Sequence, residues 1–506
     1  MHGHHPSICV WTLCNEGWGI DLDDNPDDRR WPAQAFDEAK TLVPNALAID
    51  NSPCFPRNYH LETDIEDFHW YNGFPHQNAA FDATTRAFAE RADWAWSPHG
   101  DAVKRGGEPL ICSEFGVCGL PHPQDIREKD GTEPWWFESG HDWILGAAYP
   151  HGIETRFHDA RLAAIFGGLD EFVRAAQELQ YRALKFQIET LRWRREISGY
   201  VITELNDVQW EANGLMARNR PPAFADRLAN LQREWLAVER APSTAIRAGE
   251  AADVRVRLAA AGDPPTGALL SWRFADEMRT APIGAEPVGI TIKGRAVDRI
   301  TIAALELEAR APDARLLSSN ALEFCVVPPL AAPAPSLFPM DEGAGNLLQA
   351  IGRPRASDTP DAADALLATR LTTPVREALL NGRKVALIAN SDDALVDPER
   401  ILPRDDRHNF PCMLLRARRN AVGMDSGWAL LPAAGPTALG AACPTGQCWT
   451  STGPSSCRDT SSPPSPRRPS RALSTPASPS AGFISRPPLR SAASSAKRGS
   501  PSRHLI

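Results

Sequence analysis

The sequence lacks several features that would define its class at once. It has no uninterrupted apolar run of about 18 residues, which excludes a membrane-spanning helix. Its ten cysteines form no pair of CxxC units, so neither a disulfide scaffold nor a structural zinc site is expected. No glycine-rich phosphate loop follows any apolar run, which disfavours a dinucleotide-dependent enzyme. The formal net charge of −9 gives no electrostatic case for nucleic acid as a partner.

The first residues also lack the basic and apolar segments of a signal peptide, and the compartment is left open. Three histidines (His2, His4 and His5) could suggest a metal site. His5, however, belongs to a strand motif described below, and the other two are expected to be exposed, so neither a metal nor a cofactor is predicted. The sequence does not indicate an oligomeric state.

The chain changes character along its length. Most of its 15 tryptophans precede residue 236, and short alternating runs replace them after about residue 241. The end of the chain is rich in Ser, Pro and Arg, with Asp459 as its one acidic residue, which predicts a disordered tail. A nucleic-acid-binding arm and the product of a shifted reading frame are alternatives for this tail. The predicted parts are a catalytic region (1–240), a β-sandwich (241–330), a linker (331–360), an α/β remnant (361–444) and the tail (445–506).

Apolar strands alternate with helical segments in the first part. Strands are predicted at 8–13, 46–50, 68–71, 109–116 and 199–205, with helices at 31–42, 78–98 and 158–195. This alternation predicts parallel βα units, and polar residues follow the carboxyl end of each strand. A partial (β/α)8 barrel is therefore expected, followed by a small β-sandwich in which residues such as Val254, Val256 and Leu258 share one face. A doubly wound sheet would place its site at the same strand ends.

Glu16 and Glu114 each close an apolar strand. Cleavage of a glycosidic bond needs a proton for the leaving oxygen and an attack on the anomeric carbon, and two carboxyl groups can supply both. A barrel could direct these two side chains to one point. A glutamate at a strand end can also simply be solvated, so the pair alone does not define an enzyme.

Four motifs strengthen the enzymatic interpretation. Residues 5–16 (HPSICVWTLCNE) resemble the acid/base motif of glycoside hydrolase family 2, the family of β-galactosidases, β-glucuronidases and β-mannosidases. Residues 109–116 (PLICSEFG) resemble its nucleophile strand, and residues 67–71 (DFHWY) resemble the strand between them. Residues 199–207 (GYVITELND) with 210–215 (WEANGL) are similar to its last barrel strand and loop. The motifs occur in the family's order, and the resemblance covers residues 1–330.

The resemblance implies a retaining β-glycosidase that acts on a carbohydrate without a cofactor. By this resemblance Glu16 would be the general acid/base and Glu114 the nucleophile, with a raised pKa expected for Glu16 and an ionised Glu114. Asn15 would bind the hydroxyl beside the anomeric carbon, Tyr71 would donate to the nucleophile, and His69 would line the pocket.

Two further residues are weaker candidates for substrate binding. Asp207 could contact the sugar, although helix capping after the strand explains it equally well. Trp210 could stack on a sugar face or pack as a loop aromatic. Thr203 departs from the resemblance, because many relatives carry tryptophan there, and a stacking wall could therefore be missing.

The start of the chain departs further from the family. A complete barrel needs eight strands, whereas about five are predicted here, with Glu16 at the end of what would be the fourth. We therefore expect an N-terminally truncated fragment whose open edges favour aggregation. A non-catalytic carbohydrate-binding remnant is the alternative to an active glycosidase.

Overall fold

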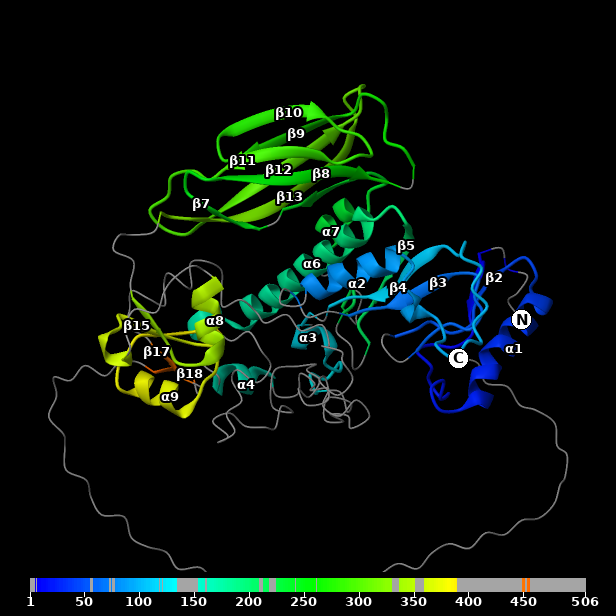
Figure 1. Cartoon of the computed structure of the whole chain (residues 1–506), viewed down its shortest axis with the longest axis horizontal. Coiled ribbons are helices and arrows are strands. Elements are labelled where there is room, and N and C mark those ends of the chain that lie inside the picture. The colour runs from blue at the N-terminus through cyan, green and yellow to red at the C-terminus, as the bar shows by residue number, and fades with distance from the viewer. Residues whose placement is uncertain are drawn as a thin grey trace, which may run out of the picture. The chain divides into compact units, whose positions relative to one another are not determined.

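The computed structural model contains parallel α/β segments and separate antiparallel sheets (Figure 1). Its strands and helices follow the element order of the sequence. No helix among these residues is long and apolar enough to cross a membrane. The residues that the structure describes are 5, 7–54, 58–71, 74, 78–117, 119–120, 122–133, 153–159, 162–208, 213–217, 224–241, 243–260, 262–329, 336–350, 359–388, 448–450 and 453–455.

Five short strands in the first part pair in parallel and form curled sheets. Strand β1 (Val10–Thr12) pairs with β2 (Leu47–Ile49). Strands β3 (Glu66–His69), β4 (Leu110–Phe115) and β5 (Ile197–Ile202) form a sheet in that order. Parallel pairing brings the carboxyl ends of β3, β4 and β5 to one edge, which is where the polar residues of the sequence lie.

Helices connect these strands. Helix α1 (Pro26–Leu42) begins after Asn25, whose side chain accepts a hydrogen bond from Asp27 N, and Pro26 suits the first helical position. Helices α2 (Asn78–Ala89) and α6 (Leu169–Trp193) contact each other, and their apolar faces share a core with β3 and β4. Phe68, Phe81 and Leu184 are fully buried there.

All three helices predicted in this part differ in extent from the observed ones. Helix α1 starts five residues earlier than expected, at Pro26. Helix α2 ends at Ala89 and a short 3-10 helix, η1 (Asp93–Ala95), follows, because Arg91 adopts a left-handed conformation with φ 58°. The long stretch at 158–195 is divided: Gly167, at φ 87°, separates α5 (Ala163–Phe166) from α6. The remaining short helices of this part are α3 (Pro123–Ile126), α4 (Ile153–Asp159) and α7 (Ala225–Leu231).

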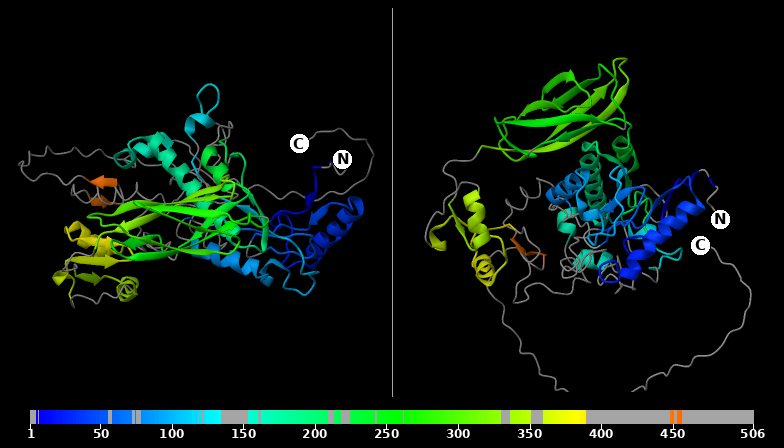
Figure 2. Two further views of the ribbon diagram at one scale, coloured as in Figure 1. Left: turned by 90° about the horizontal axis from the view of Figure 1, so that it is seen from above. Right: turned by 45° about the vertical axis from the view of Figure 1, so that its right-hand side comes forward.

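Two mainly antiparallel sheets follow, in which one strand pair, β13 with β7, is parallel, and we call them the paired sheets (Figure 2). Their inner faces share one core, in which Val254, Val256 and Leu258 are buried together with Leu270 and Phe324. The alternation in the sequence therefore marks the buried face of these strands. One sheet has the order β10 (Glu277–Pro282), β9 (Leu269–Phe274), β12 (Thr301–Arg310), β13 (Leu316–Val327), β7 (Ala245–Arg247), and the other has the order β11 (Val288–Lys293), β8 (Ala251–Ala259), β6 (Leu236–Arg240).

A strained turn joins β9 to β10. Phe274 pairs with Glu277, so the turn has two central residues, and the first of them, Ala275, has φ 53°. A positive φ at the first position only is typical of a type II′ turn, where glycine is favoured. We expect Ala275→Gly to raise the free energy of unfolding by about 1 kcal/mol, because the left-handed cost for alanine is removed.

Urea denaturation would measure this difference from the transition midpoint. The control is Ala281→Gly within β10, where glycine should lower stability by about 0.5–1 kcal/mol. A lower midpoint for Ala275→Gly would show that the turn is not strained.

A third part has its own small parallel sheet, in the order β14 (Leu337–Pro339), β15 (Ala365–Ala368), β16 (Val385–Leu387). Helices α8 (Glu342–Ala350), η4 (Pro360–Ala362) and α9 (Thr373–Leu380) accompany it. The linker predicted for 331–360 was therefore wrong in part: Ala344 and Leu348, four residues apart on one helix face, are buried with Leu367. Of the predicted tail, β17 (Cys448–Thr450) and β18 (Gly453–Ser455) are described and pair with each other, and the rest lies outside the described residues.

Candidate active site

Four of the predicted site residues meet at the carboxyl ends of β1, β3 and β4. His69 Nδ1 lies 2.8 Å from Glu16 Oε1 and 3.2 Å from Glu114 Oε2. The Tyr71 hydroxyl donates a hydrogen bond of 2.8 Å to the same Glu114 oxygen. One ligand atom each from Glu16, His69 and Glu114 lie within 4.8 Å of one another. The two carboxyl groups thus face a common point, with the imidazole between them.

The register of the parallel sheet places His69 beside Glu114. The two residues are partners across β3 and β4, and the Trp70 amide donates to the Glu114 carbonyl at 3.0 Å. A register shift between Phe68 and His69 interrupts the regular ladder at this point. Such irregularities redirect side chains near strand ends, here toward Glu16.

Glu16 is held in a tight turn after β1. Its φ is 52°, in the left-handed region that residues other than glycine seldom adopt. Gly17 follows at φ 64°, and its amide donates to Asn51 Oδ1 at 2.8 Å, which ties the turn to the end of β2. Trp18 Nε1 donates to Glu16 Oε2 at 3.1 Å. Strained conformations of this kind persist where the surrounding contacts fix them, and they cluster at functional sites.

The pKa shifts of the two glutamates are opposite to the expected order. Burial acts to raise the pKa of Glu16, but hydrogen bonding by His69, the His69 charge and a Trp18 hydrogen bond outweigh it and lower this pKa. Burial raises the pKa of Glu114, and the His69 charge and the Tyr71 hydrogen bond only partly oppose it. The expectation of a raised pKa at Glu16 was therefore wrong for the free protein. The physical reason is that most hydrogen-bond donors gather on Glu16 instead of on Glu114.

Cys54 is a neighbour of the site that the sequence analysis missed. Its thiol makes a hydrogen bond with Glu16, and its backbone forms a bridge with His69. Burial and the Glu16 charge raise the pKa of this thiol, so it stays protonated and acts as a donor. The signal in the sequence was weak, because Cys54 lies four residues beyond the apolar run that forms β2.

A buried network beneath the site was also missed. His60 lies between two carboxylates: its Nδ1 is 2.8 Å from Asp50 Oδ1, and its Nε2 is 3.3 Å from Asp67 Oδ1. All three side chains are fully buried. Ser52 and Ser113 hydroxyls donate to Asp67 Oδ2. Since Asp67 and Ser113 flank His69 and Glu114 in the sequence, this network positions the strand ends that carry the site.

The other predicted residues are placed differently. Asn15 adjoins Glu16 and forms a backbone bridge with Ser52, and its side chain is exposed. Asp207 Oδ1 accepts a hydrogen bond from the Gly214 amide at 2.8 Å, and burial raises the pKa of Asp207 to about 7. The contact closes a loop, and no helix begins at Gly214, so it is not the helix cap that was the alternative for Asp207. Trp210 lies outside the described residues.

The same trio of Glu16, His69 and Glu114 could hold a divalent cation, since carboxylate oxygens and imidazole nitrogens are frequent metal ligands. The prediction of no metal site had considered only the N-terminal histidines. Of these, His5 is described and is exposed.

Comparisons with known proteins gave distant structural similarities. A scan of family models and a search of curated proteins found no match to the chain. Among solved structures, an endo-β-1,4-mannanase from Thermotoga petrophila is 12% identical with a TM-score of 0.28, over 65% of this chain and 67% of the mannanase. A β-glucuronidase from Parabacteroides merdae is 9% identical with a TM-score of 0.28, over 66% of this chain and 38% of the enzyme. An exo-chitosanase from Amycolatopsis orientalis is 13% identical with a TM-score of 0.36, over 66% and 37%.

This chain therefore spans little more than a third of the glucuronidase and of the chitosanase. The similarities are low in both identity and TM-score. The function proposed next rests on the geometry of the site instead.

Proposed function

We propose that the chain carries the catalytic site of a retaining β-glycosidase of the family 2 type. The observation that carries this proposal is the approach of the Glu16 and Glu114 carboxyl oxygens to within 4.8 Å of each other. Retaining glycosidases hold their two carboxyl groups about 5–5.5 Å apart, whereas inverting enzymes need about 6.5–9.5 Å to admit a water molecule. A spacing at the short end leaves no room for an intervening water and favours direct attack by a carboxylate.

In this proposal the Glu114 carboxylate attacks the anomeric carbon while Glu16 gives its proton to the departing oxygen. Glu16 then takes a proton from water, the water oxygen attacks the anomeric carbon, and the bond to Glu114 breaks. In the free protein the pKa of Glu16 is lowered and that of Glu114 is raised, whereas the acid/base role calls for the opposite order once substrate is bound. His69 Nδ1 is within hydrogen-bonding distance of both carboxyl groups and is placed to pass a proton between them.

The fold that we propose for this function is part of a (β/α)8 barrel, formed by β1 to β5, followed by an immunoglobulin-like sandwich formed by the paired sheets. Polar residues at the carboxyl ends of the parallel strands support the first assignment. The shared core of the paired sheets supports the second. The substrate would be a carbohydrate, and the reaction needs no cofactor.

A 2-deoxy-2-fluoro glycoside tests the proposal because it slows breakdown of the covalent intermediate. The full chain would be incubated with 2-deoxy-2-fluoro β-glucoside, β-galactoside, β-mannoside and β-glucuronide probes, and peptide mass spectrometry would locate the sugar. We expect one adduct on Glu114 and none in a Glu114→Gln variant. An adduct on another residue would contradict the assignment of the nucleophile.

A non-catalytic, carbohydrate-binding remnant is the second candidate. It is favoured by the number of parallel strands at the site: among the described residues there are five, and a complete (β/α)8 barrel has eight. Under this alternative none of the four probes labels the chain. Binding of the parent sugars would nevertheless remain.

Tyr71 offers a test of the charge at the nucleophile. Its hydroxyl stabilises ionised Glu114, so Tyr71→Phe should raise the pKa of Glu114 further. The ionised nucleophile is lost as pH falls, and the acid limb of kcat/KM should therefore move up by about one pH unit, as a charged hydrogen bond of about 1.5 kcal/mol requires. The control is Tyr200→Phe, whose hydroxyl contacts Gln232 instead. Equal profiles for wild type and Tyr71→Phe would remove Tyr71 from the mechanism.

A further inference from the structure

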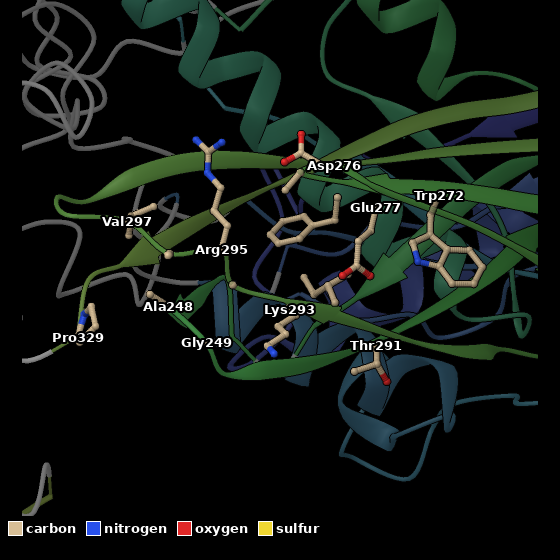
Figure 3. Close-up of a pocket in the computed structure, with 15 residues that line it drawn as sticks. Ala248, Gly249, Trp272, Asp276, Glu277, Thr291, Lys293, Arg295, Val297 and Pro329 are labelled. Carbon is tan, nitrogen blue, oxygen red and sulfur yellow. The ribbon is translucent and has the colours of Figure 1, made fainter.

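A pocket lies in the paired sheets, among residues of β9, β10 and β11 and the loops beside them (Figure 3). Its volume is about 530 Å³, which falls within the range of about 300–1,000 Å³ typical of small-molecule sites. None of the residues of the candidate active site lines it. It is therefore a separate cavity with its own chemistry.

The pocket opens where the core of the paired sheets is incompletely covered. Trp272 points to the inner face of β9 with Leu270 and Phe274, and these two neighbours are buried. Trp272 itself is only partly buried and lines the cavity. Both β10 and β11 are edge strands of their sheets, so the gap between the sheets is accessible beside them. An aromatic ring thus forms part of the pocket wall.

Polar side chains of both signs surround this ring. Asp276 and Glu277 come from the β9–β10 turn and the start of β10, and Lys293 and Arg295 come from the end of β11 and the loop after it. In Figure 3 the Glu277 side chain lies between Trp272 and Lys293. Among the ion pairs of the described residues, Glu277 pairs with Arg279 at 2.8 Å, and neither Lys293 nor Arg295 takes part in one. Both basic side chains are exposed.

An aromatic ring surrounded by acidic and basic side chains disfavours several classes of ligand. A polyanion such as a nucleic acid would meet the carboxylates of Asp276 and Glu277, and a polycation would meet Lys293 and Arg295. A lipid chain would place apolar carbon atoms against these four polar side chains and would form no hydrogen bonds with them. A neutral saccharide fits all of them: its hydroxyls both donate and accept hydrogen bonds, and the apolar face of its ring can pack on an indole.

We propose that this pocket is a second saccharide site, which binds a neutral oligosaccharide with one ring stacked on Trp272. The choice of ligand class rests on the proposed glycosidase function, since a chain that acts on carbohydrate gains from holding the same polymer at two points. Two linked sites raise the effective concentration of substrate at the first. Hydroxyls of the stacked sugar would donate to Asp276 and Glu277 and accept from Lys293 and Arg295.

Calorimetric titration of the full chain tests this proposal. All titrated variants also carry Glu114→Gln, so that bound sugars are not hydrolysed. The probes are cellohexaose, mannohexaose, xylohexaose and N-acetylchitohexaose. We expect two sites per chain for at least one probe. Adding Trp272→Ala should weaken one of them at least tenfold, whereas the control Trp31→Ala, an exposed tryptophan on α1, should leave both unchanged.

Trp272→Ala could disturb the core, so Lys293→Ala provides an independent variant at an exposed position. We expect it to weaken the same site at least threefold without changing thermal stability. The proposal is overturned if no probe binds at a site sensitive to Trp272 or Lys293, or if Trp31→Ala has the same effect. Failure of the glycosidase function alone would give a different result: one site per chain, lost with Trp272→Ala.

Discussion

Replacing Glu114 with glutamine is expected to lower kcat/KM for β-glycosides by more than about 10⁴-fold. Glutamine keeps the shape of the side chain and can still contact Tyr71 and His69, so the site should stay folded. The amide oxygen is too weak a nucleophile to displace the leaving group, and no glycosyl intermediate can form. The measurement is hydrolysis of aryl β-glycosides by purified full-length chains.

Glu16→Gln should give a different pattern, because a general acid matters only when the leaving group needs a proton. With an alkyl leaving group we expect a loss of about 10²- to 10⁴-fold. With a dinitrophenyl leaving group, formation of the intermediate should change little and its breakdown should become slow. Glu90→Gln, at an exposed position near the end of α2, is the matched control and should behave as wild type. Retention of more than a few per cent of activity by Glu114→Gln would refute its role as nucleophile.

The meeting of Glu16, His69 and Glu114 could be anticipated from the sequence for a simple reason. Each lies at or just after the end of a predicted strand, and parallel strands place their carboxyl ends along one edge. The pairing of His69 with Glu114 across β3 and β4 then needs only the correct register. The buried faces of the paired sheets could also be predicted from the sequence, because Val254, Val256 and Leu258 recur at every second position, as on one face of a β-strand.

The order of the two pKa values could not be anticipated, because it depends on which donors surround each carboxylate. Trp18 reaches Glu16 through a turn in which Glu16 itself has a positive φ, and Cys54 arrives from the segment after β2. Neither contact can be predicted from the spacing of apolar residues in the sequence. The division of the predicted 158–195 helix at Gly167 is a similar case, since a glycine inside an apolar pattern signals a break only when the backbone uses its positive φ.

The buried network under the site should dominate the stability of the first part. His60 lies fully buried between Asp50 and Asp67, and Asp50 Oδ2 also accepts hydrogen bonds from the Leu61 and Glu62 amides at 2.6 and 3.1 Å. Removing the imidazole would leave the Asp50 carboxylate buried without its counter-charge. The loss of one partner from a buried ion pair typically costs about 3–5 kcal/mol.

We therefore expect His60→Leu to lower the free energy of unfolding by about 3–5 kcal/mol, as measured by urea denaturation at pH 6. The control His122→Leu removes a surface contact with Asp170 and should cost less than about 1 kcal/mol.

Burial alone would lower the pKa of His60, but the Asp50 hydrogen bond and charge raise it to about 9. An unfolded histidine titrates near pH 6.5, so the folded state holds the extra proton between these values. The stabilisation, on the order of 3 kcal/mol, should be complete below about pH 6.5 and should disappear as the pH rises through about 9. Wild-type stability should fall across this window while His60→Leu stays nearly constant, and parallel curves for the two proteins would show that His60 is neutral in the folded state.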